Sequence, residues 1–118
     1  MDQDTVSFEV REAAPGVRII AIDGEVTPAS EAALTAAYDR ASADGSRAVI
    51  LDFEQLGYMN SGGIGLLVTL LVRAQRAKVA LLAFGLSDHY RQILELTRLD
   101  EAIAIHTSET DAVAAASA

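Results

Sequence analysis

The stretch LDFEQLGYMNSGGIG, residues 51–65, joins two apolar segments of the chain through a polar, glycine-rich loop. The segment that ends in it, Ala48 to Phe53, is almost entirely apolar, which is typical of a strand buried inside a sheet. The segment that follows, Ile64 to Ala77, is rich in helix formers and carries basic residues toward its end, as helices favour. Ser61 and its neighbouring glycines therefore lie between a predicted strand and a predicted helix.

The rest of the chain continues this alternation of strands and helices. Residues 6–10 alternate between apolar and polar, residues 17–22 are rich in β-branched side chains, and Pro15-Gly16 between them predicts a turn, so the chain should open with an antiparallel hairpin. Further elements are predicted as helices over 29–43, from Ser87 to about Thr97 and after Ser108, and as strands over 79–84 and 103–105. The order β-β-α-β-α-β-α-β-α predicts a single α/β domain over residues 1–118, with a mixed, mostly parallel sheet and helices packed on it.

Composition narrows the classes of function. A formal net charge of −8 repels the phosphates of nucleic acids and of anionic membranes. The absence of cysteine, and an acidic N-terminus unlike a secretory signal, favour a cytoplasmic protein. The longest apolar run, residues 64–72, is too short to span a membrane, so no membrane insertion is expected. Two separate histidines without cysteine give no ligand spacing for a metal, and no cofactor is expected.

Known nucleotide-binding and catalytic patterns do not fit the loop. No lysine follows its glycines, as a Walker phosphate loop requires, and the third glycine of a dinucleotide-binding pattern is missing. A nucleophile elbow around Ser61 would need glycine at position 59, where the chain has methionine. A hydrolase would also need a base, and the sequence places neither His89 nor His106 beside Ser61.

The polar pair at residues 60 and 61 suits the start of a helix. Asn60 or Ser61 can cap it by accepting a hydrogen bond from a free backbone N–H, an interaction worth about 1 kcal/mol. Gly62 and Gly63 lower helix propensity in the first turn, which predicts a backbone that another group approaches closely. An exposed hydroxyl at such a helix start is also where an added phosphate would be stabilised by free N–H groups and the helix dipole.

The helix after the loop is apolar on nearly every side over residues 64–72. Two explanations remain open from the sequence. Neighbouring helices could bury both of its sides, or some of its side chains could form a patch for another protein, since exposed apolar patches often mark interfaces. The candidates for such a patch are Leu67, Leu70, Leu71 and Val72.

These residues together resemble the STAS domain of bacterial anti-sigma factor antagonists. The strand end LDF at 51–53, the loop with Leu56, Tyr58 and Met59, and NSGGIG at 60–65 are similar to the family's Asp-Ser-Ser/Thr-Gly-Leu-Gly region. Gly24-Glu25-Val26 resembles the family's segment before its first helix, and the strand at 79–84 with the helix after it resembles its last third. The resemblance covers nearly the whole chain.

The resemblance implies a switch between binding partners. In this family the first hydroxyl residue of the motif, here Ser61, is phosphorylated by a GHKL-type serine kinase that is also an anti-sigma factor. The unphosphorylated antagonist binds that partner and releases the sigma factor, and a PP2C-type phosphatase resets the switch. The chain would be a substrate and a binding partner, without catalytic activity of its own. The residues implied in partner binding are Thr27, Met59, Asn60, Ser61, Gly62, Gly63, Leu67 and Leu70.

The sequence departs from the family pattern at three of these positions. Asn60 replaces an aspartate before the acceptor, Gly62 replaces the second hydroxyl residue, and Thr27 replaces an acidic residue after Gly24-Glu25-Val26. The alternative function is therefore a STAS interaction module without the switch, such as a stressosome-like subunit or the small subunit of a lipid transporter. The oligomeric state stays open.

Overall fold

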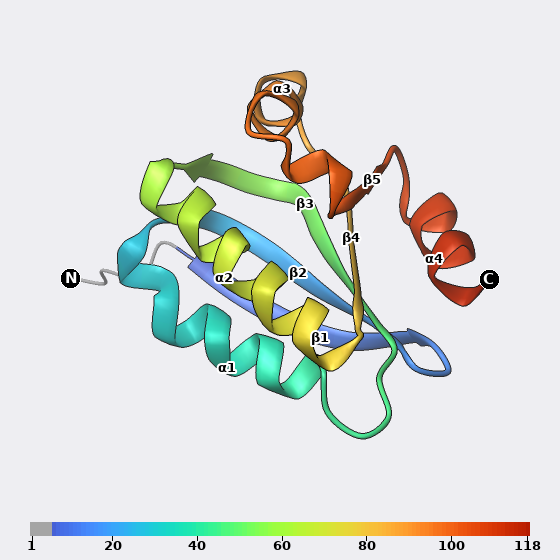
Figure 1. The fold of residues 1–118 in the computed structure, drawn as a ribbon. Helices are drawn as coiled ribbons and strands as arrows, with labels where there is room; N and C mark the ends of the chain where they lie inside the picture. The colour runs from blue at the N-terminus through green and yellow to red at the C-terminus, as the bar shows by residue number, and fades with distance from the viewer. Residues whose placement is uncertain (1–5) are drawn as a thin grey trace.

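Five strands form one sheet in the computed structural model, which describes residues 6–118 (Figure 1). The strands, in the spatial order β1-β2-β3-β4-β5, are β1 (Val6–Ala14), β2 (Val17–Val26), β3 (Ala48–Met59), β4 (Ala80–Phe84) and β5 (Ala104–His106). β1 is antiparallel to β2, and all other neighbours pair in parallel. The predicted mixed, mostly parallel sheet is confirmed. Residues 1–5 of the domain predicted over 1–118 lie outside the described residues.

Helices connect the parallel strands in the predicted order. They are α1 (Glu31–Ala41), α2 (Ser61–Ala77), α3 (Asp88–Leu96) and α4 (Glu109–Ser117), with short 3₁₀ turns η1 (Pro28–Ser30) and η2 (Leu99–Glu101). Figure 1 shows α1 and α2 lying side by side across the sheet, with α4 beside β5 near the C-terminus. The resulting architecture is a single α/β domain.

The two faces of the sheet bury separate apolar clusters, because successive side chains of a strand point to opposite faces. The larger cluster lies under α1 and α2 and contains, among others, Ile20, Ile22, Val49, Leu51 and Phe53. The smaller one lies under α4 and includes Ile19, Ile50, Leu82, Phe84 and Ala112. The first two helices are therefore held against the same face, and their N-termini follow the ends of β2 and β3.

Element boundaries differ from the prediction most clearly around the loop after residue 53. The predicted strand ends at Phe53, but β3 continues to Met59 because its second half pairs with β2 as far as Val26↔Met59. β4 pairs only with Ala48 to Asp52, so the far half of β3 extends beyond it. The predicted ten-residue loop is thereby reduced to Asn60, and α2 begins at Ser61.

Smaller differences occur at four other elements. The predicted helix over 29–43 is split into η1 and α1, because Thr27 caps a 3₁₀ turn that starts at Pro28. The strand predicted over 79–84 begins one residue later, and the one predicted over 103–105 runs from Ala104 to His106. The third helix begins at Asp88 and ends at Leu96, with Ser87 as its N-cap as predicted.

Candidate functional site

The start of α2 is a capped helix N-terminus with an exposed hydroxyl. Asn60, the N-cap, has extended backbone angles, and its side-chain oxygen accepts a hydrogen bond from the Gly63 N–H at 2.8 Å. Ser61 is the first helical residue, and its side chain is exposed. The first turn of α2 contains no acidic residue, so the positive end of the helix dipole is uncompensated by charge there. Asn60, which the sequence offered as one of two possible caps, fills that role.

Gly62 and Gly63 allow other parts of the same chain to approach the helix closely. A Cβ atom at Gly63 would collide with the carbonyl oxygen of Val26 and lie 2.8 Å from Cγ of Met59. A Cβ atom at Gly62 would collide with the ring of Pro28. The prediction of a close approach is confirmed, but the approaching groups come from the end of β2, from η1 and from β3 rather than from a ligand.

Thr27 lies at the end of β2, where it caps η1. Its hydroxyl oxygen accepts from the Ala29 N–H at 3.3 Å, while its own N–H donates to the Ser30 hydroxyl at 3.1 Å. The two bonds form a capping box that fixes Pro28 against the start of α2. Thr27 is half-buried, so part of its side chain stays at the surface.

Met59 lies beneath the exposed residues of the site and is hydrogen-bonded to α3. Its side chain is buried, and its N–H donates to the hydroxyl oxygen of Tyr90 at 2.9 Å. This bond gives the Met59 N–H a partner in the part of β3 that extends beyond its pairing with β4. Sequence reasoning missed both Tyr90 and Pro28, because each acts through a contact with residues more than thirty positions away and no local pattern marks it.

We call Thr27, Met59, Asn60, Ser61, Gly62 and Gly63 the α2 N-terminal site. The structure brings all six together at the ends of β2 and β3 and the first turn of α2. Ser61 is exposed, Thr27, Asn60 and Gly62 are half-buried, and Met59 and Gly63 are buried. The outer four can contact a partner, whereas the inner two set the position of the helix.

Leu67 and Leu70 do not belong to this surface. They are 1% and 2% exposed and pack in the larger core cluster with Leu71. Of the two explanations left open by the sequence, burial therefore holds for these leucines, and their place among the predicted partner-binding residues is wrong. Because α2 needs its apolar stripe to cover the sheet, these side chains point inward. On the outer side of the helix, Val68 and Val72 are each 40% exposed, and Val72 is the one predicted patch residue at the surface.

The two histidines make no catalytic pair with Ser61 among residues 6–118. His89 is exposed on α3, with its ring edge-on to Tyr90, and His106 ends β5. No hydrogen bond between described residues joins either ring to the Ser61 hydroxyl. Among the same residues, no helix has both the length and the apolar character that crossing a bilayer requires.

Replacing Asn60 tests the cap. Asn60→Ala is expected to lower the free energy of unfolding by about 1 kcal/mol, because the Gly63 N–H loses its acceptor. Asn60→Asp keeps an acceptor and adds a charge that suits the helix N-terminus, so it should change stability by less than about 0.5 kcal/mol. Urea unfolding of the three proteins, followed by circular dichroism, measures both. Equal losses in the two variants would show that the side chain does not act as a cap.

Sequence comparison places the chain in a family. Residues 10–112 match the model of the STAS domain, so the chain belongs to the STAS domain family. This confirms the resemblance inferred from the motif residues. Comparison with curated proteins finds no match.

Solved structures show the same fold at low sequence identity. An anti-sigma factor antagonist from Mycobacterium paratuberculosis superposes with a TM-score of 0.83 at 20% identity, covering 99% of this chain and 98% of the other. The Bacillus anti-sigma factor antagonist SpoIIAA, in its unphosphorylated form, gives 0.72 at 19% identity, with 91% and 93% covered. A sulfate transporter family protein from Wolinella succinogenes gives 0.77 at 20%, with 91% and 89% covered. The shared architecture thus occurs in proteins of different roles.

Proposed function

We propose that this protein is an anti-sigma factor antagonist whose binding is switched by phosphorylation of Ser61. Unphosphorylated, it would bind a GHKL-type anti-sigma factor kinase in the cytoplasm and release a sigma factor. A PP2C-type phosphatase would restore the binding form. The observation that carries the proposal is the exposed Ser61 hydroxyl at the first position of a capped helix, within a STAS domain.

Charge supports this role for Ser61. A phosphate adds about −1.5 to −2 charge at neutral pH, and the free N–H groups and dipole at the start of α2 stabilise a negative group there. Because the first turn has no acidic residue and Asn60 is neutral, the phosphate would meet no carboxylate in that turn. The modified residue would then expel a closely packed partner through repulsion and desolvation.

The contact surface proposed for the partner is formed by Thr27, Asn60, Ser61 and Gly62. These residues are exposed or half-buried, and they come from two elements that Pro28 and the glycines hold together. Met59 and Gly63 would support the surface from inside. Since the cap, the turn η1 and the helix start are fixed by hydrogen bonds, the surface is preorganised for binding.

A second candidate is a STAS interaction module that is not switched. It is favoured by the glycine at position 62, where the Pro28 ring occupies the space a second hydroxyl residue would need, and by the fold shared with a sulfate transporter family protein. Such a module, as a stressosome-like or lipid-transporter subunit, would use the same surface without modification of Ser61.

A phosphopeptide map separates the two candidates. The protein is purified from its own host during growth and under stress, and its intact mass and Ser61 peptide are measured. The switch predicts a phosphate on Ser61 whose occupancy changes between the two conditions. A well-observed Ser61 peptide without phosphate in both conditions would contradict the switch and favour the second candidate.

A further inference from the structure

The second half of β3 is paired with a strand on one side only. β2 follows it as far as Val26↔Met59, whereas β4 pairs with β3 only from Ala48 to Asp52. Residues 53–59 therefore lie on an edge of the sheet that β4 leaves open. Backbone groups on such an edge have no ladder partner, and a strand end frays unless another group binds it. The α2 N-terminal site lies at this strand end, so its geometry depends on what binds the edge.

The segment from Gly85 to Tyr90 takes the place of β4 beside this edge. Gly85, directly after β4, has a φ of +83°, and a Cβ atom there would lie 2.8 Å from the backbone nitrogen of Glu54. Five residues later, in the first turn of α3, the Tyr90 hydroxyl oxygen accepts from the Met59 N–H at 2.9 Å. The segment thus contacts β3 near both ends of its open half, and Figure 1 shows α3 on that side of β3.

Tyr90 is itself held in place by its neighbours. Its half-buried ring packs against the larger core cluster, and the His89 ring lies edge-on to it with the ring centroids 4.8 Å apart. Its N–H donates to the hydroxyl of Ser87, the N-cap of α3, at 3.4 Å. A group that packing has already oriented loses little further conformational entropy when it forms a hydrogen bond. The Tyr90 hydroxyl is therefore a preorganised acceptor for Met59.

From Met59 the restraint passes directly to the start of α2. Asn60, the next residue, donates its N–H to the Val26 carbonyl oxygen at 3.4 Å, so β3 ends with its last N–H groups bound by β2 and by α3. The side chain of Asn60 caps the Gly63 N–H, and Cγ of Met59 would lie 2.8 Å from a Cβ atom at Gly63. A displacement of Met59 would therefore disturb the cap and, with it, Ser61.

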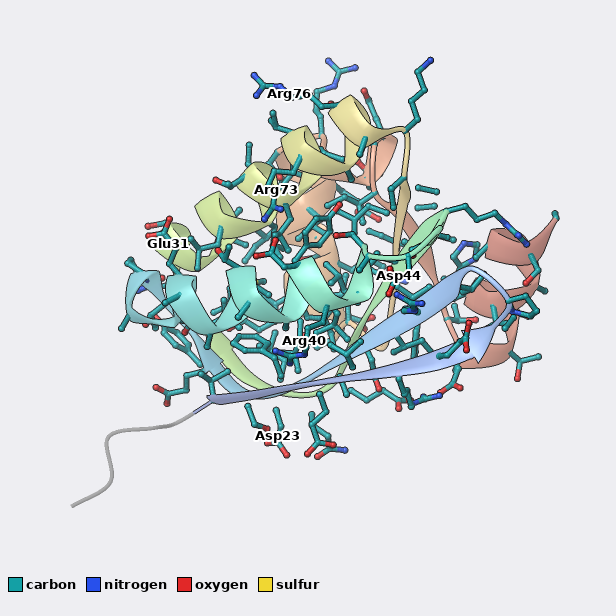
Figure 2. The ribbon with its side chains drawn as sticks, turned by 90° about the horizontal axis from the view of Figure 1, so that it is seen from below. Asp23, Glu31, Arg40, Asp44, Arg73 and Arg76 are labelled. Atoms are coloured by element: carbon teal, nitrogen blue, oxygen red, sulfur yellow. The ribbon has the colours of Figure 1, made fainter. Side chains whose placement is uncertain are left out.

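The other end of α2 is held independently. Figure 2 shows Arg73 reaching from α2 toward α1, where it pairs with Asp39 at 2.6 Å and its guanidinium lies 4.9 Å from the centroid of the Tyr38 ring. These contacts lie three turns beyond Ser61. The first turn of α2 can therefore loosen without release of the whole helix.

We propose that Tyr90 is a positioning residue for the α2 N-terminal site. Its hydroxyl fixes the end of β3 on the edge that β4 leaves open, and so holds the Asn60 cap and the Ser61 hydroxyl in the orientation in which a partner meets them. Tyr90 acts through Met59 and the cap rather than through the Ser61 hydroxyl itself. Only the consequence for phosphorylation rests on the proposed function; the positioning of the helix start does not.

Amide hydrogen exchange in Tyr90→Phe tests the positioning. The variant keeps the packed ring and removes only the hydroxyl, so it should fold normally, which thermal unfolding checks. We expect the Met59 and Gly63 amides to exchange about tenfold faster, and the amide of Ile20, which pairs with both β1 and β3, to change less than about threefold. Acceleration at Met59 without Gly63 would show a bond that does not act on the helix start. Equal acceleration at all three amides would show a general loss of stability, and either result would overturn the proposal.

Tyr58→Phe is the matched control. It removes the same hydroxyl from the neighbouring residue of β3, whose side chain is 49% exposed. Because substitutions of exposed groups away from a specific contact have small effects, the exchange of the Met59 and Gly63 amides should stay within about twofold of the natural protein. Acceleration as large as in Tyr90→Phe would contradict a specific role of Tyr90.

Phosphorylation kinetics show what the positioning does for the proposed switch. With the GHKL-type kinase of the same host, Tyr90→Phe should raise the KM for Ser61 about fivefold and leave kcat within about twofold, because a smaller fraction of the substrate is in the binding-competent form. An unchanged KM together with accelerated exchange would contradict the role in presenting Ser61. If the natural protein is not phosphorylated at all, the switch fails, and the exchange of Met59 and Gly63 relative to Ile20 still decides the positioning.

Discussion

Replacing Gly63 with alanine is expected to lower the free energy of unfolding by about 2–4 kcal/mol. The new methyl group would meet the carbonyl oxygen of Val26, which belongs to a strand in the middle of the sheet and cannot move aside. It would also lie 2.8 Å from Cγ of Met59, in a position that is buried. Relief would require α2 to move away from β2, which would disturb the core under it. Urea unfolding monitored by circular dichroism measures the loss.

Gly65→Ala is the matched control for this substitution. Gly65 lies in the same turn of α2, and a Cβ atom there would have no atom within 4 Å apart from its chain neighbours and the adjacent backbone of the helix itself. Because alanine favours a helix interior over glycine, Gly65→Ala should raise the free energy of unfolding by about 0.5–1 kcal/mol. Similar changes in both variants would show that helix propensity, and not the contact with Val26, governs position 63.

Replacing Ser61 with aspartate is expected to weaken binding to the cognate anti-sigma factor kinase about 100-fold, or ~2.7 kcal/mol. Ser61 is exposed at the centre of the proposed contact surface, so a carboxylate there would be desolvated without a partner when the kinase docks. Ser61→Ala removes only a hydroxyl and should bind within about threefold of the natural protein. Isothermal titration calorimetry with the kinase of the same host measures all three affinities.

An added charge elsewhere on the same helix controls for nonspecific repulsion. Thr69 is exposed on α2, two turns beyond Ser61, and Thr69→Asp carries the same charge as Ser61→Asp. It should change affinity less than about threefold, because rim charges contribute little. If Ser61→Asp binds as tightly as Ser61→Ala, phosphorylation of this residue does not control binding. If Thr69→Asp loses as much affinity as Ser61→Asp, the effect is one of net charge and not of the site.

Some features of the α2 N-terminal site could be predicted from short stretches of sequence. A polar residue at position 60 ahead of an apolar segment indicates a helix cap, since the cap bond joins residues three positions apart. The sequence also shows the position of Ser61 at the helix start and the departures from the family pattern at residues 27 and 62. The end of β3 could not be predicted in this way, because pairing with β2 extends the strand through residues that are polar or glycine.

The direction in which the α2 side chains point is also decided by the tertiary structure. Residues 64–72 are apolar on nearly every side, so their periodicity does not choose between burial of Leu67 and Leu70 and their exposure. The choice follows from the position of α1 beside α2 and of the sheet beneath them, which turns the leucines inward and leaves Val68 and Val72 outside. Composition alone does not contain the geometry that buries the two leucines.

The sequence by itself determined the order of the elements, the hairpin, the capped helix start and the position of Ser61 at it, because periodicity, turn residues and caps act between near neighbours. Only the tertiary structure decided what touches the glycines and which side chains of α1 and α2 meet. Val26 and Pro28 reach Gly63 and Gly62 across more than thirty residues, and Tyr38 meets Arg73 from another helix. Such contacts depend on how helices and strands pack together, and no local sequence pattern specifies the distances between them.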